Sequence, residues 1–392
     1  MATANVRGDV LRWARESAGL DLRTAAKRLK VKPDTVAAWE GTGAKFSVVR
    51  LREIARVVKR PIAALLLANP PAEPPGPTDF RTVPESERKP LSPRTILALR
   101  RARRVQRLAQ ELGAALDSPA RPQLEPLSLT DDPVAAAATL RRSLGVTFDE
   151  QRSWRSASDA LRGWSQAVES RGVLVVQASI AVEEIRGVSL GDLQPPVIVV
   201  STKDRSTARC FSLFHELGHL LLASPGMCDP FSVESAASGE VEAQGVRRIE
   251  TFCNRLAGSV LVPEADLRTI VGGRTDRDSW SDEKLRATAD VFKVSREVLL
   301  LRFVSLGWAS QDFYNHKSQE WREAARDAKS RGGHAPKPER KCLRNNGRTF
   351  VALTLEAHER GAITRRDVGD YLAVQLRYVP AIENLLRSGT TG

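Results

Sequence analysis

The chain has few cysteines, few histidines and no long apolar run. Its four cysteines, Cys210, Cys228, Cys253 and Cys342, include no CxxC pair. This favours reduced thiols over a disulfide framework. No stretch of about 18 apolar residues occurs, and the first twenty residues lack an apolar h-region. We therefore expect no membrane span and no secretory signal, and a cytoplasmic location.

A glycine-rich phosphate loop and internal repeats are also missing, which argues against a nucleotide-binding P-loop and a repeat fold. At 392 residues the chain is long enough for two or three domains.

Its net charge of +13 is unevenly distributed. Residues 1–124 hold 24 Lys+Arg and 12 Asp+Glu, a balance of +12, so residues 125–392 carry only +1. The basic first third indicates a nucleic-acid partner, and a general bias toward arginine is the alternative.

Short amphipathic helices are predicted between residues 10 and 67. Asp21 is placed to N-cap "LRTAAKRL", and Pro33 fits the first turn of "PDTVAAWE". A helix, a short turn and a second helix form the helix-turn-helix pattern, with residues 33–40 as the recognition helix. The proline-rich stretch 69–93 then predicts an extended linker. It is followed by an arginine-rich helix that either follows phosphates or presents a solvated face.

Continuous β-branched runs predict three strands, "GVLVVQAS", "VEEIRGVSLGD" and "PPVIVVSTKD". Residues 132–172 are expected to form two helices. The rest of the chain is mostly helical by its apolar periodicity. The sequence thus predicts a mainly α chain with a small β-sheet, of the α+β class.

Two of the five histidines lie in "FSLFHELGHLLL". On a helix, His215 and His219 are one turn apart on one face, so both can reach one ion, and Glu216 can face a water on it. This is the HExxH pattern of two zinc ligands and a general base. The surrounding helix is apolar almost all round, so these polar groups need partners. Two core histidines bonded to neighbours are the alternative.

A catalytic zinc ion needs a third protein ligand. Glu234, Glu240 and Glu242 are expected in a polar loop, whereas Glu250 falls inside the apolar arc of "RRIETFCNRLAGSVLVP". A metal would account for a carboxylate there, and an ion pair with a neighbouring arginine is the alternative. Asn254, one turn further, could orient Glu250 or the substrate. Cys210 and Cys253 are expected to be core thiols.

These segments, "TARCFSLFHELGHLLL" and "IETFCNRLAGSVLVP", resemble the ImmA/IrrE family of metallopeptidases. The N-terminal segment is similar to the XRE/Cro-type helix-turn-helix fused to that family in bacterial and phage regulators. The resemblance implies a zinc-dependent endopeptidase of the gluzincin kind. His215, His219 and Glu250 match the family's Zn²⁺ ligands, and Glu216 matches its catalytic glutamate.

The composition, the periodicity and the resemblance together predict a domain order. We expect a helix-turn-helix domain (1–68), a proline-rich linker (69–93), a basic helix (94–125), a zincin-like metallopeptidase domain (126–270) and a helical C-terminal region with a helix-turn-helix-like pair (271–392). Family members typically cleave a repressor and so induce stress or mobile-element genes. The expected partners are a repressor-like protein substrate and DNA, and a homodimer is left open.

The N-terminal segment departs from its family at Leu22, where a polar phosphate contact is usual. The predicted recognition helix also has few side chains that read bases. Phosphate binding remains open for five basic side chains: Arg23, Lys27, Lys30, Lys32 and Lys45. Asp34 and Thr35, at the start of the predicted recognition helix, are further candidates for DNA contact. The module could instead recognise a protein.

Two functions follow from these observations. The first is a zinc peptidase that cleaves one regulatory protein and is coupled to a DNA-binding domain. The second is a DNA-binding regulator or antitoxin-like protein without turnover, in which the zinc site is structural or sensory.

Overall fold

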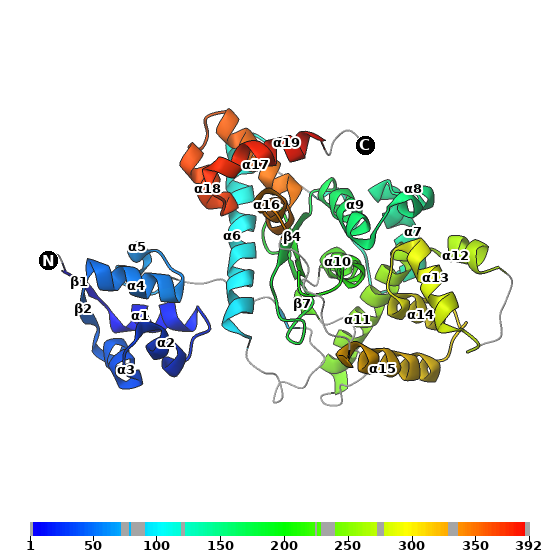
Figure 1. The fold of residues 1–392 in the computed structure, drawn as a ribbon, viewed down its shortest axis with the longest axis horizontal. Coiled ribbons are helices and arrows are strands. Elements are labelled where there is room, and N and C mark those ends of the chain that lie inside the picture. Colours follow the sequence, from blue (N-terminus) through cyan, green and yellow to red (C-terminus); the bar gives the residue numbers. More distant parts are fainter. Residues whose placement is uncertain are drawn as a thin grey trace. The chain divides into compact units, whose positions relative to one another are not determined.

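The computed structural model describes residues 3–71, 78–79, 91–118, 122–223, 226–228, 240–272, 278–327 and 336–388 (Figure 1). The chain divides into two compact units. Unit 1 contains Met1–Gly76 and Lys89–Arg101, and unit 2 contains Pro77–Arg88 and Ala102–Gly392. Helices dominate both units, so the predicted mainly α class with small sheets is confirmed. No helix in the described ranges is both long and apolar enough for a bilayer crossing.

Unit 1 is a helical bundle closed by a small antiparallel sheet. Its elements are β1 (Thr3–Val6), α1 (Gly8–Glu16), α2 (Leu22–Leu29), α3 (Pro33–Thr42), β2 (Ala44–Ser47), α4 (Val48–Val58) and α5 (Ile62–Leu65). Asp21 accepts a hydrogen bond from the Thr24 amide and caps α2, as the sequence predicts. The pairing of β1 with β2 was not predicted, because it joins residues some forty positions apart.

Unit 2 is built around a five-stranded mixed sheet in the order β3-β7-β5-β6-β4. Its strands are β3 (Thr78–Asp79), β4 (Leu174–Ala178), β5 (Gly187–Leu190), β6 (Val197–Ser201) and β7 (Gly226–Cys228). β4, β5 and β6 are the strands that the sequence predicts, and β6 is buried along its whole length, as a continuous apolar run requires. β3 and β7 are too short to give a sequence signal, and their pairing was not predicted.

The helices that follow the linker agree with expectation in one place and differ in another. α6 (Pro93–Ala115) covers the predicted arginine-rich helix, and it ends shortly before Asp117, which takes a left-handed φ of 52°. Residues 132–172 form three helices, not two: α7 (Pro133–Leu144), α8 (Phe148–Ser153) and α9 (Ala157–Glu169). Ser156 caps α9 with its side chain, which separates α9 from α8.

Two long helices form the centre of unit 2. α10 (Ser206–Leu221) packs against β5 and β6, and α11 (Glu240–Leu261) crosses over it (Figure 1). The helices approach closely at Gly218, where an added Cβ would lie 3.0 Å from Cys253 Sγ. α10 is buried on almost every side because the sheet and α11 cover opposite faces.

The carboxyl end of α11 is held by polar side chains from three other helices. Arg141 donates to the Val260 carbonyl at 2.8 Å, and Gln151 donates to the Leu261 carbonyl at 2.9 Å. Arg302 donates to the next carbonyl, that of residue 262, at 3.1 Å. The last carbonyls of a helix have no partner within it, and cations there also suit the helix dipole. These contacts fix α11 at one end.

The remaining helices cover the sides of unit 2. They are α12 (Glu264–Val271), α13 (Asp282–Phe292), α14 (Arg296–Ser305), α15 (Gln311–Asp327), α16 (Pro338–Asn346), α17 (Arg348–Glu359), α18 (Arg365–Leu372), η2 (Leu376–Tyr378) and α19 (Val379–Ser388).

Glu169, at the end of α9, ties the C-terminal helices to the sheet. Its carboxylate accepts hydrogen bonds from the amides of Val175 in β4 and Arg348 at the start of α17. Gly347 has a φ of 78°, and an added Cβ there would lie 2.3 Å from Glu169 Oε1. Glu169 thus replaces a local cap for α17. Burial raises the pKa of Glu169 to about 8, although these amide donors oppose the shift.

This shift predicts a pH-dependent stability. The pKa of Glu169 is higher in the folded chain than in the unfolded chain, so protonated Glu169 stabilises the fold. Its contribution to the free energy of unfolding is complete below pH ~4.5 and is lost as the pH rises through about 8. The loss of unfolding free energy is about 1.4 kcal/mol for each unit by which the folded pKa exceeds the unfolded one. Glu169→Gln removes this loss, because glutamine does not titrate. We expect the thermal midpoint of Glu169→Gln, relative to wild type, to rise between pH 5 and pH 8.5. The exposed Glu359→Gln in α17 is the control, and an equal rise in both variants would contradict the assignment.

Candidate metal centre

The side chains of the HExxH helix point into the interior of unit 2. His215, Glu216 and His219 on α10 are all 0% exposed. Their neighbours on the helix are mostly apolar and anchor it on every side: Cys210, Phe211, Leu213, Phe214, Leu217 and Leu221. The two imidazoles therefore have fixed positions, with their Nε2 atoms 3.1 Å apart.

α11 brings Glu250 against these imidazoles. Glu250 Oε2 lies 3.3 Å from His215 Nε2, and Oε1 lies 3.2 Å from His219 Nε2. Glu250 is 1% exposed, so the apolar arc predicted from the sequence does carry it inward. Among the described residues, Glu250 forms ion pairs with the two histidines and not with the arginines of its own helix.

The three side chains form a cluster that could hold a metal ion. A tetrahedral zinc ion with ligands at about 2.0–2.1 Å has neighbouring ligand atoms about 3.3–3.4 Å apart. The observed separations of 3.1, 3.2 and 3.3 Å are close to that value. Neither Glu250 oxygen accepts a hydrogen bond of ordinary geometry from a described residue. A buried carboxylate in this position is costly without a cation, so the donor set fits a divalent metal.

The charges within the cluster also suit a cation. Burial raises the pKa of Glu250, but the facing imidazoles outweigh burial and lower it to about 2, so the carboxylate stays ionised. Burial lowers the pKa of His215, and the negative charge of Glu250 outweighs this and raises it. A proton and a metal ion therefore compete for the same imidazole nitrogens.

Asn254 lies one turn beyond Glu250 and contacts His215. Its Oδ1 is 2.8 Å from His215 Nδ1, and because that oxygen accepts, Nδ1 donates the proton. In the neutral ring, Nε2 then carries the lone pair that a metal ligand needs, on the side that faces Glu250 and His219. The sequence suggested that Asn254 orients Glu250 or the substrate, and the contact found in the structure is instead with a histidine. Such outer contacts fix the ring of a metal ligand.

Glu216 lies against the sheet, beside β5. A Cβ added at Gly187 would lie 2.5 Å from Glu216 Oε1 and 2.7 Å from its Cγ. The carboxylate therefore occupies space that any larger residue at position 187 would fill. Gly187 was not predicted from the sequence as part of the site. A glycine inside a strand is a signal for close approach, but it does not identify the group that approaches.

The two cysteines near the cluster are core thiols, as expected. Cys210 is buried in α10, and burial raises its pKa to about 12. Burial, together with the charges of Glu250 and Glu216, raises the pKa of Cys253 well above its usual range. Both therefore remain protonated, a form that does not bind zinc.

The other acidic candidates lie elsewhere or cannot be placed. Glu234 falls outside the described residues. Glu240 and Glu242 were expected in a loop, but α11 already begins at Glu240, so that expectation is wrong. The sequence from residue 240 onward continues the helical pattern, with Gly245 tolerated inside it. Of the side chains at 240 and 242 the structure describes nothing.

The residues considered for DNA contact are spread over unit 1. Arg23 and Lys27 lie on α2, Lys30 ends it with a φ of 56°, and Lys32 precedes α3. Of the seven candidates, those with exposed side chains are Arg23, Lys27, Lys30, Lys32, Asp34 and Lys45, while Thr35 is half-buried. Further along α3, the exposed positions include Ala37, Ala38 and Gly41, which offer no base-reading groups.

Two arginine side chains of helix α6 form hydrogen bonds or ion pairs within the protein. Arg100 donates to the carbonyls of Ser17 and Lys59 within unit 1. Arg103 forms an ion pair with Asp192 within unit 2. These two side chains are therefore not free to follow phosphates.

The contact between Asn254 and His215 predicts a role in metal affinity. Replacing Asn254 with Leu removes the acceptor for Nδ1–H, and loss of such an outer contact typically weakens metal binding by about 10–100-fold. Competition with a chromophoric chelator measures the affinity for divalent metal. Thr251→Leu, on the exposed face of the same helix, is the control and should change it little. Equal affinities for the Asn254 variant and wild type would show that the contact does not support the ligand.

Comparison with known proteins supports this interpretation of unit 2. Residues 168–304 match the family model of the IrrE N-terminal-like domain, Peptidase_M78. The match extends from the end of α9 into α14, and it includes His215, Glu216, His219 and Glu250. A search of curated proteins found no match. The segment 168–304 is thus similar to the metallopeptidase-like domain of the ImmA/IrrE type, and the match does not extend to the N-terminal helices.

Proposed function

We propose that the chain is a zinc-dependent metallopeptidase of the HExxH gluzincin type. His215, His219 and Glu250 would hold the zinc ion, and Glu216 would act as general base. The observation that carries the proposal is the convergence of two buried imidazole nitrogens and one buried carboxylate within 3.3 Å of one another. The match of this segment to a peptidase family supports it.

The residues divide the chemistry among them. Zinc would supply a Lewis acid that makes water nucleophilic near neutral pH. Glu216 would take a proton from the attacking water and pass it to the amine nitrogen as the peptide bond breaks. Asn254 would hold the His215 ring, and the apolar walls would strengthen each of these charge interactions by excluding bulk water.

The centre is closed as it stands. Glu216 and the three candidate ligands are at most 1% exposed. A peptide bond can reach them only when the segments that cover them move apart, so an opening step would precede cleavage.

The substrate we propose is a repressor-like regulatory protein, and unit 1 would bring the peptidase to its target through DNA. The +12 balance of residues 1–124 supports phosphate binding, whereas the small side chains on α3 argue against base reading. The alternative is a DNA-binding regulator or antitoxin-like protein with a structural or sensory zinc site, which the closed centre would suit. A salt-dependent electrophoretic shift that persists without any cleavage activity would favour that alternative.

Glu216→Gln tests the proposed chemistry. The amide keeps the shape of the side chain but cannot take a proton, so we expect cleavage to fall by about 10²–10⁴-fold. Zinc content should stay unchanged, because Glu216 is not a proposed ligand. Mass spectrometry of neighbouring-gene products incubated with the zinc-loaded protein measures cleavage. Full cleavage by the variant would remove Glu216 from the reaction.

Gly187→Ala tests the position of Glu216. The added methyl group would meet Oε1 at 2.5 Å and force the carboxylate to move. We expect a loss of at least about tenfold in kcat, since small displacements of a catalytic group are costly, with zinc content retained. Gly245→Ala, where no atom lies within 4 Å, is the control and should keep full activity. Unchanged kcat in Gly187→Ala would contradict this positioning.

A further inference from the structure

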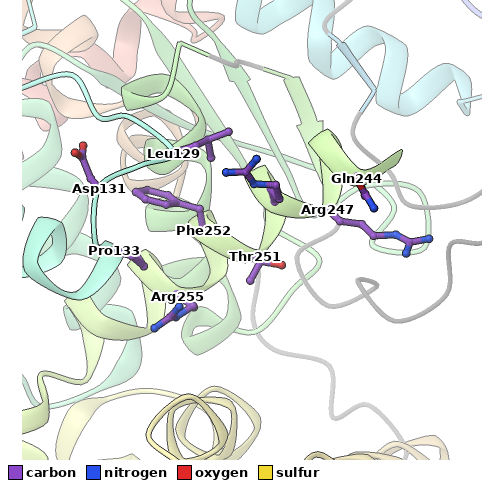
Figure 2. Close-up of a pocket in the computed structure, with 9 residues that line it drawn as sticks. Leu129, Asp131, Pro133, Gln244, Arg247, Thr251, Phe252 and Arg255 are labelled. Atoms are coloured by element: carbon purple, nitrogen blue, oxygen red, sulfur yellow. The ribbon is translucent and has the colours of Figure 1, made fainter. Parts of the chain in front are cut away.

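A surface cleft borders α11 on the side away from the metal cluster. It has a volume of about 370 Å³ and is shown in Figure 2. We propose that this cleft binds an acidic segment of the protein substrate, away from the bond that is cut. The proposal rests on the peptidase function above, and it adds the chemistry by which the substrate is recognised.

The rim of the cleft is positively charged. Arg247, Arg248 and Arg255 line it from α11, and all three are exposed. None of these guanidinium groups forms a salt bridge with a described residue. Asp131 is the acidic group that lines the cleft, and one of its oxygens accepts a hydrogen bond from the Ser128 amide. Within the part of the chain that the structure describes, the three arginines have no acidic partner, and the carboxylates of a ligand match their geometry.

The floor of the cleft is apolar. Phe252, Leu129 and Pro133 line it between the arginines and the core (Figure 2). A pocket with an apolar floor and an arginine rim suits a peptide that inserts one apolar side chain and places Asp or Glu on either side. Duplex nucleic acid presents phosphates along a rigid backbone and has no such side chain to insert. The lining therefore favours an acidic peptide.

The cleft and the metal cluster share one helix. Arg247, Thr251 and Arg255 follow one another at four-residue spacing and form a stripe along α11. Glu250 points about 100° away from the centre of this stripe around the helix axis. A helix with its side chains is about 10–12 Å across, so a substrate bound in the cleft would lie within a few residues' reach of the cluster.

Binding of a labelled peptide to the full-length protein tests the proposal without any need for cleavage. The probe is a fluorescein-labelled peptide of about a dozen residues with a central Leu flanked by Asp and Glu. Two control peptides replace the acidic residues with Asn and Gln, or the Leu with Ser. The protein variant is Arg247→Glu/Arg255→Glu. Its matched control is Arg365→Glu/Arg366→Glu, on exposed positions of α18.

We expect the Arg247/Arg255 variant to bind the acidic peptide at least about tenfold more weakly, and the Arg365/Arg366 variant to bind within about twofold of wild type. Both control peptides should bind more weakly than the probe, and circular dichroism should show all variants folded. Equal loss in both variants would mean general charge attraction and would overturn the site. A larger loss for a DNA duplex than for the peptide would also overturn it. Because no turnover is measured, an inactive but peptide-binding protein would count against the peptidase function alone.

Discussion

The close crossing of α10 and α11 is the constraint on which the candidate centre depends. Two imidazoles come from one helix and the carboxylate from the other, so the cluster exists only if the helix axes approach closely. Gly218 permits this, since a Cβ there would already press on Cys253 Sγ at 3.0 Å. The sheet on the far side of α10 prevents the helix from yielding. The geometry of the three ligands is thus set by packing rather than by the ligands themselves.

This packing places charge where it is costly. Glu250 and Glu216 are both buried, and the facing imidazoles lower the pKa of Glu250 to about 2 instead of letting it neutralise. A carboxylate that remains ionised in an apolar interior attracts a cation strongly. The far end of α11 is held separately, where Arg141 donates to the Val260 carbonyl and Arg302 donates to the carbonyl of residue 262, just past the helix.

Much of the centre could be predicted from the sequence because it depends on local periodicity. The four-residue spacing of His215 and His219 and the apolar arc around Glu250 both follow from one helical repeat. The contact between Asn254 and His215 and the approach of Gly187 to Glu216 could not, since they join residues on different elements. The same reason hides the β1–β2 pairing and the Glu169 cap of α17. Periodicity shows which face is buried, and only the fold shows what that face meets.

α11 connects the proposed peptide-binding cleft to the candidate metal centre. Its inner face carries Glu250 and Asn254, and its outer face carries three exposed arginines that form no salt bridge with a described residue, beside an apolar cleft. The carboxyl end of α11 is held by hydrogen bonds from other helices. A ligand that binds the outer face would therefore move mainly the part of the helix that bears Glu250. A rotation or shift of that half changes the distance from Glu250 to both imidazoles at once. A ligand in the cleft that prefers one position of α11 would therefore alter the affinity of the cluster for its metal, and by thermodynamic linkage the metal would alter the affinity of the cleft for the ligand.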